Sequence, residues 1–329
     1  MNPSLRLEYL SAEDLHATRS DKATNILGVI EFAAEPGLNP GADFPFAWVD
    51  IPVLGASTVF ETWLSEHPVV RDDTNEVTSA RNDEVLFGCV QIEHPGTLDD
   101  ASYEAYVRVF DFIDSRGYAH LLRVWNYFPA INGDAQGLER YRRFCRGRHE
   151  AFTAKGKVIG EDTPAASALG SRSGPLTVYF LAGKTPGERI ENPRQMSAYR
   201  YPPQYGPRSP TFSRGMLMHA GESTRLFISG TAGIVGHETQ HAGNAVEQAR
   251  ETVANIRVVM AQAGIDPTTQ APRRLMFKAY VRHLEDLDVA RRTLNGAFGE
   301  SIEVIFLQAD ICRTDLLLEI EGVCFDQRR

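Results

Sequence analysis

The sequence predicts an α/β (α+β) protein built from mixed β-sheets that carry helices on one face. Strand-like apolar runs alternate with segments of helical periodicity, and the order of these elements repeats along the chain, which indicates duplicated domains. In addition, the 329 residues are 43% hydrophobic and 23% charged, which is typical of a globular protein with a large core.

The clearest copy of the repeat follows residue 217. Six apolar residues between Val246 and Ala263 recur at spacings of three and four, and Gly264 follows where a C-terminal cap belongs. We therefore expect a helix over 244–263. The other elements expected in this copy are strands at 226–229, 275–281, 302–307 and 316–323 and a helix at 286–298.

The same order of elements is predicted in the middle of the chain. The runs "VLFGCVQI", "LLRVWNYF" and "LTVYFLAG" are strand-like, and a helical segment ends before Gly117. The expected elements are strands at 85–92, 121–128 and 176–183 and helices at 103–115 and 138–152.

The first 80 residues look like a degenerate third copy. We expect strands at 25–34 and 46–54 and a helix at 57–67, "STVFETWLSEH". The predicted domains are therefore 1–80, 81–190 and 217–329. Between the last two lies 191–216, where residues 192–210 hold five prolines and three tyrosines. We interpret this segment as a loop that covers a cleft, with a plain linker as the alternative.

The segment His237-Glu238-Thr239-Gln240-His241 has the H-E-x-x-H spelling of a zinc protease. This spacing serves zinc only on a helix, where residues i and i+4 place two imidazoles on one face. Gly236 and Gly243 bracket the motif and disfavour a helix there, and no H-x-x-G-x-x-H extension follows. We expect a loop at this position and no metal or other cofactor.

Charge and cysteine usage exclude further classes of function. The net charge of −9 argues against nucleic acid or an anionic membrane as the main partner. The cysteines at 89, 145, 312 and 324 show no metal-binding spacing, and the N-terminus lacks an apolar signal segment. We expect a cytoplasmic protein with reduced thiols whose partner is a small molecule.

Several motifs carry a family resemblance. "FISGTAG", "AQAGI", "FKAYVRHLEDLDVARRTL" and "EIEG" resemble the reactive-intermediate deaminase (Rid) fold over residues 217–323. "YFPAIN", "FCRGRHEAF", "NPRQMSAYRYPPQYGPRSP" and "CRTDLLLEIEGV" resemble the chorismatases, which are similar along nearly the whole chain. This resemblance implies a monomer with pseudo-threefold symmetry and an active site between the central and C-terminal domains.

Two glutamates are the candidates for acid chemistry. In the expected strand "LLLEIEG", Glu319 and Glu321 face the same way, about 7 Å apart, and we expect them to raise each other's pKa. The alternative is an edge strand with two solvated glutamates. Splitting pyruvate from chorismate without a metal needs an acid that protonates the methylene carbon of the enol ether. The resemblance assigns that role to Glu319.

The two carboxylates of chorismate call for arginines, whose planar guanidinium groups bind carboxylates bidentately. Arg148 is our first candidate because the resemblance places it in the cleft, and Arg143 lies on the same predicted helix. The further candidates are Arg194, Arg291 and the ring-covering Tyr199 and Tyr205.

Cys312 and Gly233 bear on the product. Without the resemblance, Cys312 reads as a small buried apolar residue. The resemblance implies that cysteine at 312 and glycine at 233 mark the chorismatases that form 3-hydroxybenzoate. The predicted reaction is chorismate to 3-hydroxybenzoate and pyruvate, with 4-hydroxybenzoate left open as a second product. The alternatives are hydrolysis to a dihydroxycyclohexadiene carboxylate, a Rid-type imine deaminase, and a module that binds an aromatic acid without converting it.

Overall fold

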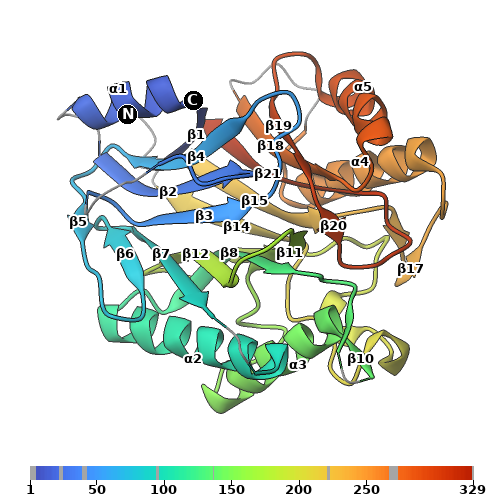
Figure 1. Ribbon diagram of the computed structural model, residues 1–329, viewed down its shortest axis with the longest axis horizontal. Coiled ribbons are helices and arrows are strands. Elements are labelled where there is room, and N and C mark those ends of the chain that lie inside the picture. Colours follow the sequence, from blue (N-terminus) through green and yellow to red (C-terminus); the bar gives the residue numbers. More distant parts are fainter. Residues whose placement is uncertain are drawn as a thin grey trace.

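β-sheets form the interior of the molecule and helices cover their outer faces (Figure 1). The computed structural model describes residues 5–21, 25–38, 43–93, 96–135, 137–220, 223–266 and 273–327. Within these ranges, no helix is long and apolar enough to cross a membrane. The predicted class of mixed α/β fold is confirmed.

The C-terminal repeat follows the predicted order closely. Helix α4 (Ala245–Gln262) begins after Asn244, whose side chain accepts a hydrogen bond from the Glu247 amide, as expected of an N-cap. Its sheet has the order β13-β14-β15-β21-β18-β19. The other elements are β13 (Glu188–Ile190), β14 (Gly215–Ala220), β15 (Ser223–Thr231), β18 (Arg273–Val281), α5 (Leu287–Phe298), β19 (Glu303–Gln308) and β21 (Leu318–Gln327).

The central repeat also agrees with the predicted order and adds strands that the sequence did not reveal. Its sheet has the order β20-β11-β8-β12-β7-β6-β5. The elements are β5 (Val70–Arg71), β6 (Thr78–Arg81), β7 (Val85–Ile92), α2 (Leu98–Arg116), β8 (His120–Pro129), α3 (Arg140–Ala154), β11 (Ala165–Ser171), β12 (Leu176–Gly183) and β20 (Asp310–Ile311). Because β20 comes from the C-terminal part of the chain, it ties the two repeats together.

The N-terminal repeat contains the main error of the sequence prediction. Residues 57–67 were expected to form a helix, but Thr58–Ser65 is strand β4, which pairs with β1 (Leu5–Leu10) on one side and β2 (Asn25–Ala33) on the other. The strand is buried on both faces, so its apolar residues show no alternation that would separate it from a helix. The remaining elements are α1 (Ala12–Ser20), which was not predicted, and β3 (Phe46–Asp50).

The same strand order occurs in all these repeats. Counted along each repeat, the third strand lies parallel to the second, and the fourth is antiparallel to both the second and the first. These runs are β3-β2-β4-β1, β11-β8-β12-β7 and β19-β18-β21-β15. One topology, repeated along the chain, supports the expected duplication. The exact domain boundaries stay a prediction.

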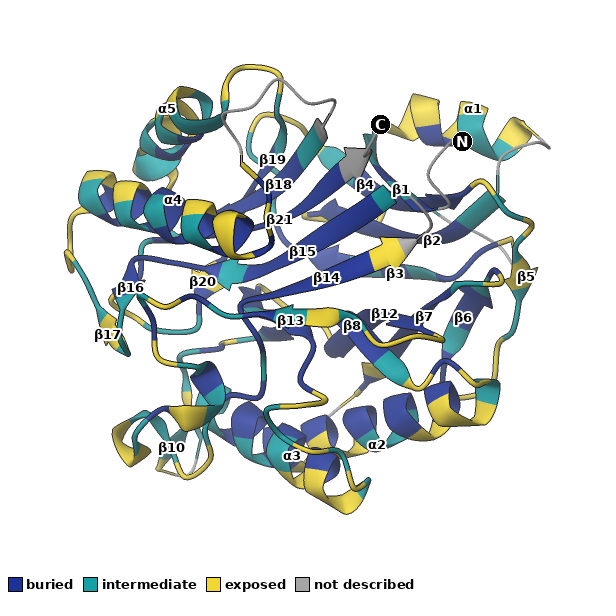
Figure 2. Ribbon diagram, turned by 180° about the vertical axis from the view of Figure 1, so that it is seen from behind, coloured by how far each residue is buried: buried dark blue, intermediate teal, exposed yellow. Residues whose placement is uncertain are grey.

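The inner faces of the sheets meet in one shared core. Trp63 of β4 contacts Trp125 of β8 and Phe227 of β15, with ring centroids 5.7 and 6.3 Å apart, so the aromatic rings of different repeats pack on each other. Figure 2 shows that the strands are mostly buried, whereas the helices expose their outer faces. The side chains of the sheets, and not the helices, therefore hold the repeats together.

Candidate active site

A cavity of about 280 Å³ lies between the central and C-terminal repeats. Its lining comes from the start of helix α3, from residues 201–214, from the end of β15 and the turn that follows it, from the 312–316 loop and from strand β21. Its aromatic lining is Tyr141, Tyr201, Tyr205 and Phe212, and its basic lining is Arg142, Arg214 and Arg313. Its acidic side chains include Glu319 of β21. An apolar wall with a few convergent charges is typical of a small-molecule site.

Glu319 is held at the inner end of this cavity as a protonated acid. Its side chain is buried, and a methyl group at Gly230 would lie 1.9 Å from its Oε1, so the carboxyl group has room only because residue 230 is glycine. Burial and the charge of Glu321 raise the pKa of Glu319 to about 8, although Arg123 and Arg214 oppose this increase. At neutral pH the carboxyl group can therefore donate a proton.

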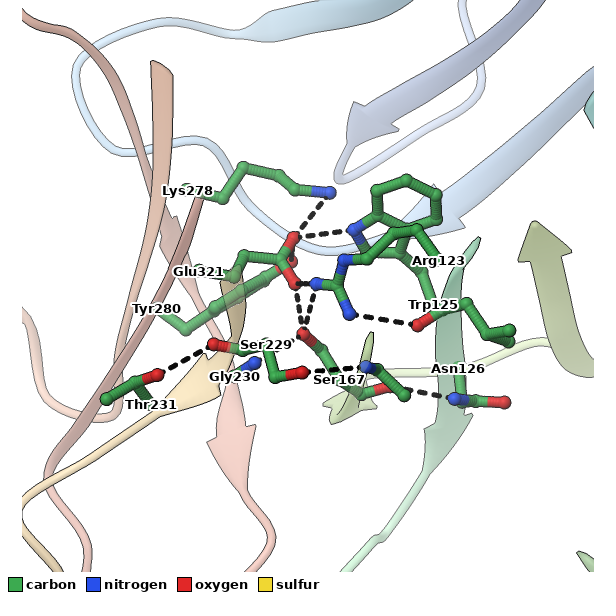
Figure 3. A network of polar contacts seen from close by, with 12 residues as sticks. Arg123, Trp125, Asn126, Ser167, Ser229, Gly230, Thr231, Lys278, Tyr280 and Glu321 are labelled. Atoms are coloured by element: carbon green, nitrogen blue, oxygen red, sulfur yellow. Dashed lines mark hydrogen bonds and ion pairs between the residues drawn. The ribbon is translucent and has the colours of Figure 1, made fainter. Parts of the chain in front are cut away.

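Glu321 has the opposite character. Arg123, Ser167, Trp125, Lys278 and Tyr280 all donate to its carboxylate, with Trp125 Nε1 at 2.9 Å and Tyr280 OH at 3.0 Å (Figure 3).

The increase in pKa that the sequence predicts for Glu321 is therefore wrong. Burial by itself would raise this pKa, but Lys278 and Arg123 lower it. The alternative of an edge strand is also wrong, since β21 lies between β15 and β18 and both glutamates are buried. Glu319 is therefore a protonated acid, and Glu321 is a buried carboxylate anion.

Cys312 follows β20 and packs where the core of the central repeat meets the cavity. Burial is the main cause that raises the pKa of its thiol far above the usual range, and Glu319 adds to it. The side chain is thus a neutral thiol close to Glu319, and not a thiolate nucleophile. Its effect on chemistry would come from its size and shape.

Arg148 is buried outside the lining of the main cavity. Its guanidinium group lies over the ring of Tyr106, 4.7 Å from the centroid, and its Nε and Nη2 have no hydrogen-bond partner within the described residues. It lines a smaller cavity of about 40 Å³ that shares Glu319 and Cys312 with the main one. Thr211, whose hydroxyl group also has no partner in the described part of the chain, lines the same space. Unpaired buried donors are costly unless a ligand accepts from them.

The other predicted arginines lie elsewhere. Arg143 Nη1 is 2.7 Å from Asp99, and Arg194 Nη2 is 2.5 Å from Glu251. Arg291 lies on α5 over the ring of Phe306. None of these arginines belongs to the lining of the main or the smaller cavity as the described residues define them.

Of the remaining predicted residues, one lines the cavity and two do not. Tyr205 lines the cavity, whereas Tyr199 lies beside Gly160 and its hydroxyl group accepts a hydrogen bond of 3.4 Å from Arg189. Gly233 lies between Ala232 and Ile234, which both line the cavity, but its own α-carbon faces helix α4. A methyl group at 233 would lie 3.3 Å from the Cα of Gln248 and would press on that helix.

The cavity lining contains three arginines that were not predicted as site residues: Arg142, which forms an ion pair with Glu139, and Arg214 and Arg313. Arg214 donates to the hydroxyl group of Tyr201 and to the carbonyl group of Met196, each at 2.8 Å, and its buried Nε has no partner among the described residues. The guanidinium carbon (Cζ) of Arg313 lies 4.1 Å from the ring centroid of Tyr205. Arg313 stands next to Cys312 in the family-like motif, a signal that could have identified it. Arg214 precedes a strand and has no such signal.

The H-E-T-Q-H segment forms no helix, so its two histidines do not share a helical face. The short strands β16 (Ile234–Val235) and β17 (Glu238–Thr239) pair across it, and Nδ1 of His237 lies 3.1 Å from the hydroxyl group of Tyr205. Across the described ranges, no group of three or more His, Cys, Asp or Glu side chains is placed to hold a metal ion. The expectation of a non-helical segment before a helix near residue 244 is confirmed.

The fold and the cavity together define an α/β protein with a site lined by aromatic and arginine side chains, beside a carboxylic acid whose pKa is raised. Comparisons with known proteins then identify the family. A family model described as "Chorismatase FkbO/Hyg5-like, N-terminal" matches residues 61–182. A 3-hydroxybenzoate synthase from Streptomyces hygroscopicus is 36% identical over 313 residues, which are 91% of this chain and 91% of that protein.

Further relatives agree over the whole length. A chorismatase from Streptomyces rapamycinicus is 37% identical over 334 residues, covering 98% of this chain and 99% of its own. The crystal structure of a chorismatase matches with a TM-score of 0.87 and 35% identity, covering 97% of this chain and 98% of that one. The chain belongs to the chorismatase family.

Proposed function

We propose that this protein converts chorismate to 3-hydroxybenzoate and pyruvate, with Glu319 as the acid that protonates the methylene carbon of the enol ether. The observation that carries the proposal is the carboxyl group of Glu319, which lies in a cavity lined by several arginines. Burial and the charge of Glu321 raise its pKa to about 8, so it holds its proton at neutral pH. An acid with a pKa near the working pH is suited to proton transfer. The 3-hydroxybenzoate synthase from Streptomyces hygroscopicus, 36% identical, supports the choice of product.

Arg148 and Arg214 are the residues that we propose for the two substrate carboxylates. Both are buried, and both have a guanidinium nitrogen that no described residue pairs with. Arg148 lies in the smaller cavity and Arg214 in the larger one, and both cavities reach Glu319. A dicarboxylate that spans the two would place its central part beside the acid. The rings of Tyr141, Phe212 and Tyr205 line the space and can cover the substrate ring.

The reaction balances without an oxidant or a reductant. The proton from Glu319 forms a new C–H bond at the methylene carbon and leaves an oxocarbenium ion. The neighbouring ring hydroxyl group attacks the carbon that bears the ether, and the C–O bond breaks so that its electrons form the keto group of pyruvate. The attacking hydroxyl group releases its proton as the epoxide forms, and the ring carbon releases a second proton as the epoxide opens and the ring becomes aromatic. One of these protons is taken up by the epoxide oxygen and the other restores the acid form of Glu319. The two products contain the same atoms as chorismate, so the net reaction consumes no water.

Cys312 and Gly233 are proposed to direct the reaction to this product. Because the thiol of Cys312 is neutral and close to Glu319, it can exclude water from the oxocarbenium ion, whereas capture of that ion by water would give the dihydroxycyclohexadiene carboxylate. Gly233 acts through the position of the backbone between Ala232 and Ile234.

Incubation of the purified protein with chorismate, followed by chromatography of the products, tests the proposal. We expect 3-hydroxybenzoate and an equal amount of pyruvate. The dihydroxycyclohexadiene carboxylate as the main product would indicate a hydrolase instead. Binding of chorismate without any product would favour a module that only binds an aromatic acid.

A further inference from the structure

The N-terminal repeat contributes no described residue to the lining of the main cavity, yet it supplies a buried charge to the network behind Glu319. Glu61 of β4 is fully buried, and its Oε2 lies 2.6 Å from Nζ of Lys278. Trp63 Nε1 at 2.9 Å and Tyr179 OH at 3.0 Å donate to the same carboxyl group. All three partners are donors, which is the pattern that an ionised carboxylate accepts.

Lys278 connects Glu61 to Glu321. Its Nζ is also 2.7 Å from Oε1 of Glu321, so two carboxylates from different repeats share one ammonium group. Arg123 is the second cation bound to Glu321. These four side chains are at most 3% exposed and form a closed group of two cations and two anions. Solvent screens such a buried group poorly.

Glu319 lies on strand β21, two residues before Glu321, and is therefore next to this group of four charges. Within the described residues, Glu319 forms no ion pair. If Glu319 also ionised, a third buried carboxylate would stand beside the two cations of this group, which is unfavourable in a buried environment. Arg214 on the cavity side offsets this cost only in part, since the pKa of Glu319 stays raised. Removing the charge of Glu61 would instead leave an unmatched cation that favours ionised Glu319. The charge balance therefore connects the N-terminal sheet to the protonation of the acid.

We propose that Glu61 is a positioning residue, which acts through Lys278 and Glu321 to keep Glu319 in its proton-donating form. This inference rests on the proposed function of Glu319. The N-terminal repeat would then take part in catalysis, although none of its described residues lines the cavity. The other charged or titratable groups around this path are Tyr9 on β1, Arg123 and Tyr127 on β8, Tyr179 on β12, Tyr280 on β18, and Arg214, Tyr141 and Cys312 on the cavity side.

The substitution Glu61→Gln tests the proposal because it keeps the shape and removes one charge. Glu319 must be protonated to act, so kcat/KM falls as the pH rises through its pKa. A charge removed on the order of 10 Å away should move this alkaline limb about one pH unit to lower pH. On the alkaline side, kcat/KM should then be about tenfold below that of the wild type, with near-equal values on the acidic side.

Two further variants separate this electrostatic role from a structural one. Glu31→Gln is the matched control, since Glu31 is buried in the same sheet but binds the backbone amides of Gly37 and Leu38, and its alkaline limb should not move. The double variant Glu61→Gln, Lys278→Met removes one charge of each sign and should move the limb back toward that of the wild type. A loss of activity that is equal at every pH, or a double variant that fails to restore the limb, overturns the proposal.

An infrared titration makes the test independent of turnover. The signal of the Glu319 carboxyl group, identified by its absence in Glu319→Gln, can be followed against pH without chorismate. In Glu61→Gln it should lose its proton at lower pH than in the wild type. An unshifted titration contradicts the inference, whereas a shifted titration in a protein that does not convert chorismate contradicts only the proposed function.

Discussion

Glu319→Gln should abolish turnover and at the same time stabilise the protein near neutral pH. The amide keeps the shape of the side chain but cannot deliver a proton, and loss of a general acid commonly costs ~10²–10⁴-fold in rate. The effect on stability follows from the environment of Glu319, whose pKa burial and Glu321 raise from 4.5 to about 8. A buried group that resists ionisation opposes folding wherever the unfolded chain would ionise it.

The magnitude and its sign can be worked out from these pKa values. Between pH 4.5 and 8 the folded protein holds a proton on Glu319 that the unfolded chain releases, so this residue makes stability fall as the pH rises. At 1.36 kcal/mol per pH unit, the loss is about 1.4 kcal/mol at pH 5.5, about 3.4 kcal/mol at pH 7 and ~5 kcal/mol above pH 8. Glutamine does not titrate, so Glu319→Gln escapes this loss.

The assay is urea unfolding of the wild type and of Glu319→Gln at pH 5.5 and pH 7. We expect the difference in unfolding free energy between the two proteins to change by about 2 kcal/mol in favour of the variant between these pH values. The control is Glu300→Gln, since Glu300 is exposed in the turn after α5. A difference that stays constant with pH, or that grows in favour of the wild type, would refute the reasoning on Glu319.

Three further predictions concern the cavity and its chemistry. The double variant Cys312→Ala, Gly233→Ala should still release pyruvate but divert product from 3-hydroxybenzoate toward the dihydroxycyclohexadiene carboxylate; unchanged products with a slower rate would reduce Cys312 to ordinary packing. Arg148→Lys should lower kcat/KM for chorismate by ~10²-fold, because an ammonium group cannot bind a carboxylate bidentately. Its control is Arg250→Lys, on the exposed face of α4, and equal kinetics in the two variants would remove Arg148 from the site. Treatment with a chelator should leave activity intact, whereas full loss with recovery on adding zinc would contradict the reaction scheme.

Local patterns were enough to predict much of the central and C-terminal repeats. The strands at 85–92 and 176–183 and the helix after Asn244 lie where the sequence predicts them, because periodicity and capping depend on neighbouring residues. Alternation along one strand was also enough to place Glu319 and Glu321 on one face. Strand β4 could not be recognised in this way, because a strand buried on both faces loses the alternation that identifies it.

The character of each glutamate was decided only by the tertiary structure. Arg123 is 198 residues from Glu321 in the sequence, and Lys278 is 217 residues from Glu61, yet these pairs form ion pairs in the shared core. The spacing of Glu319 and Glu321 predicts that they repel each other, but not which of them receives the cations. The pKa of each glutamate depends on its burial and on the charges around it, and the side chains that set both come from several sheets. Sequence order alone therefore determines which residues share a strand, and the packing of the repeats determines which of them is the acid.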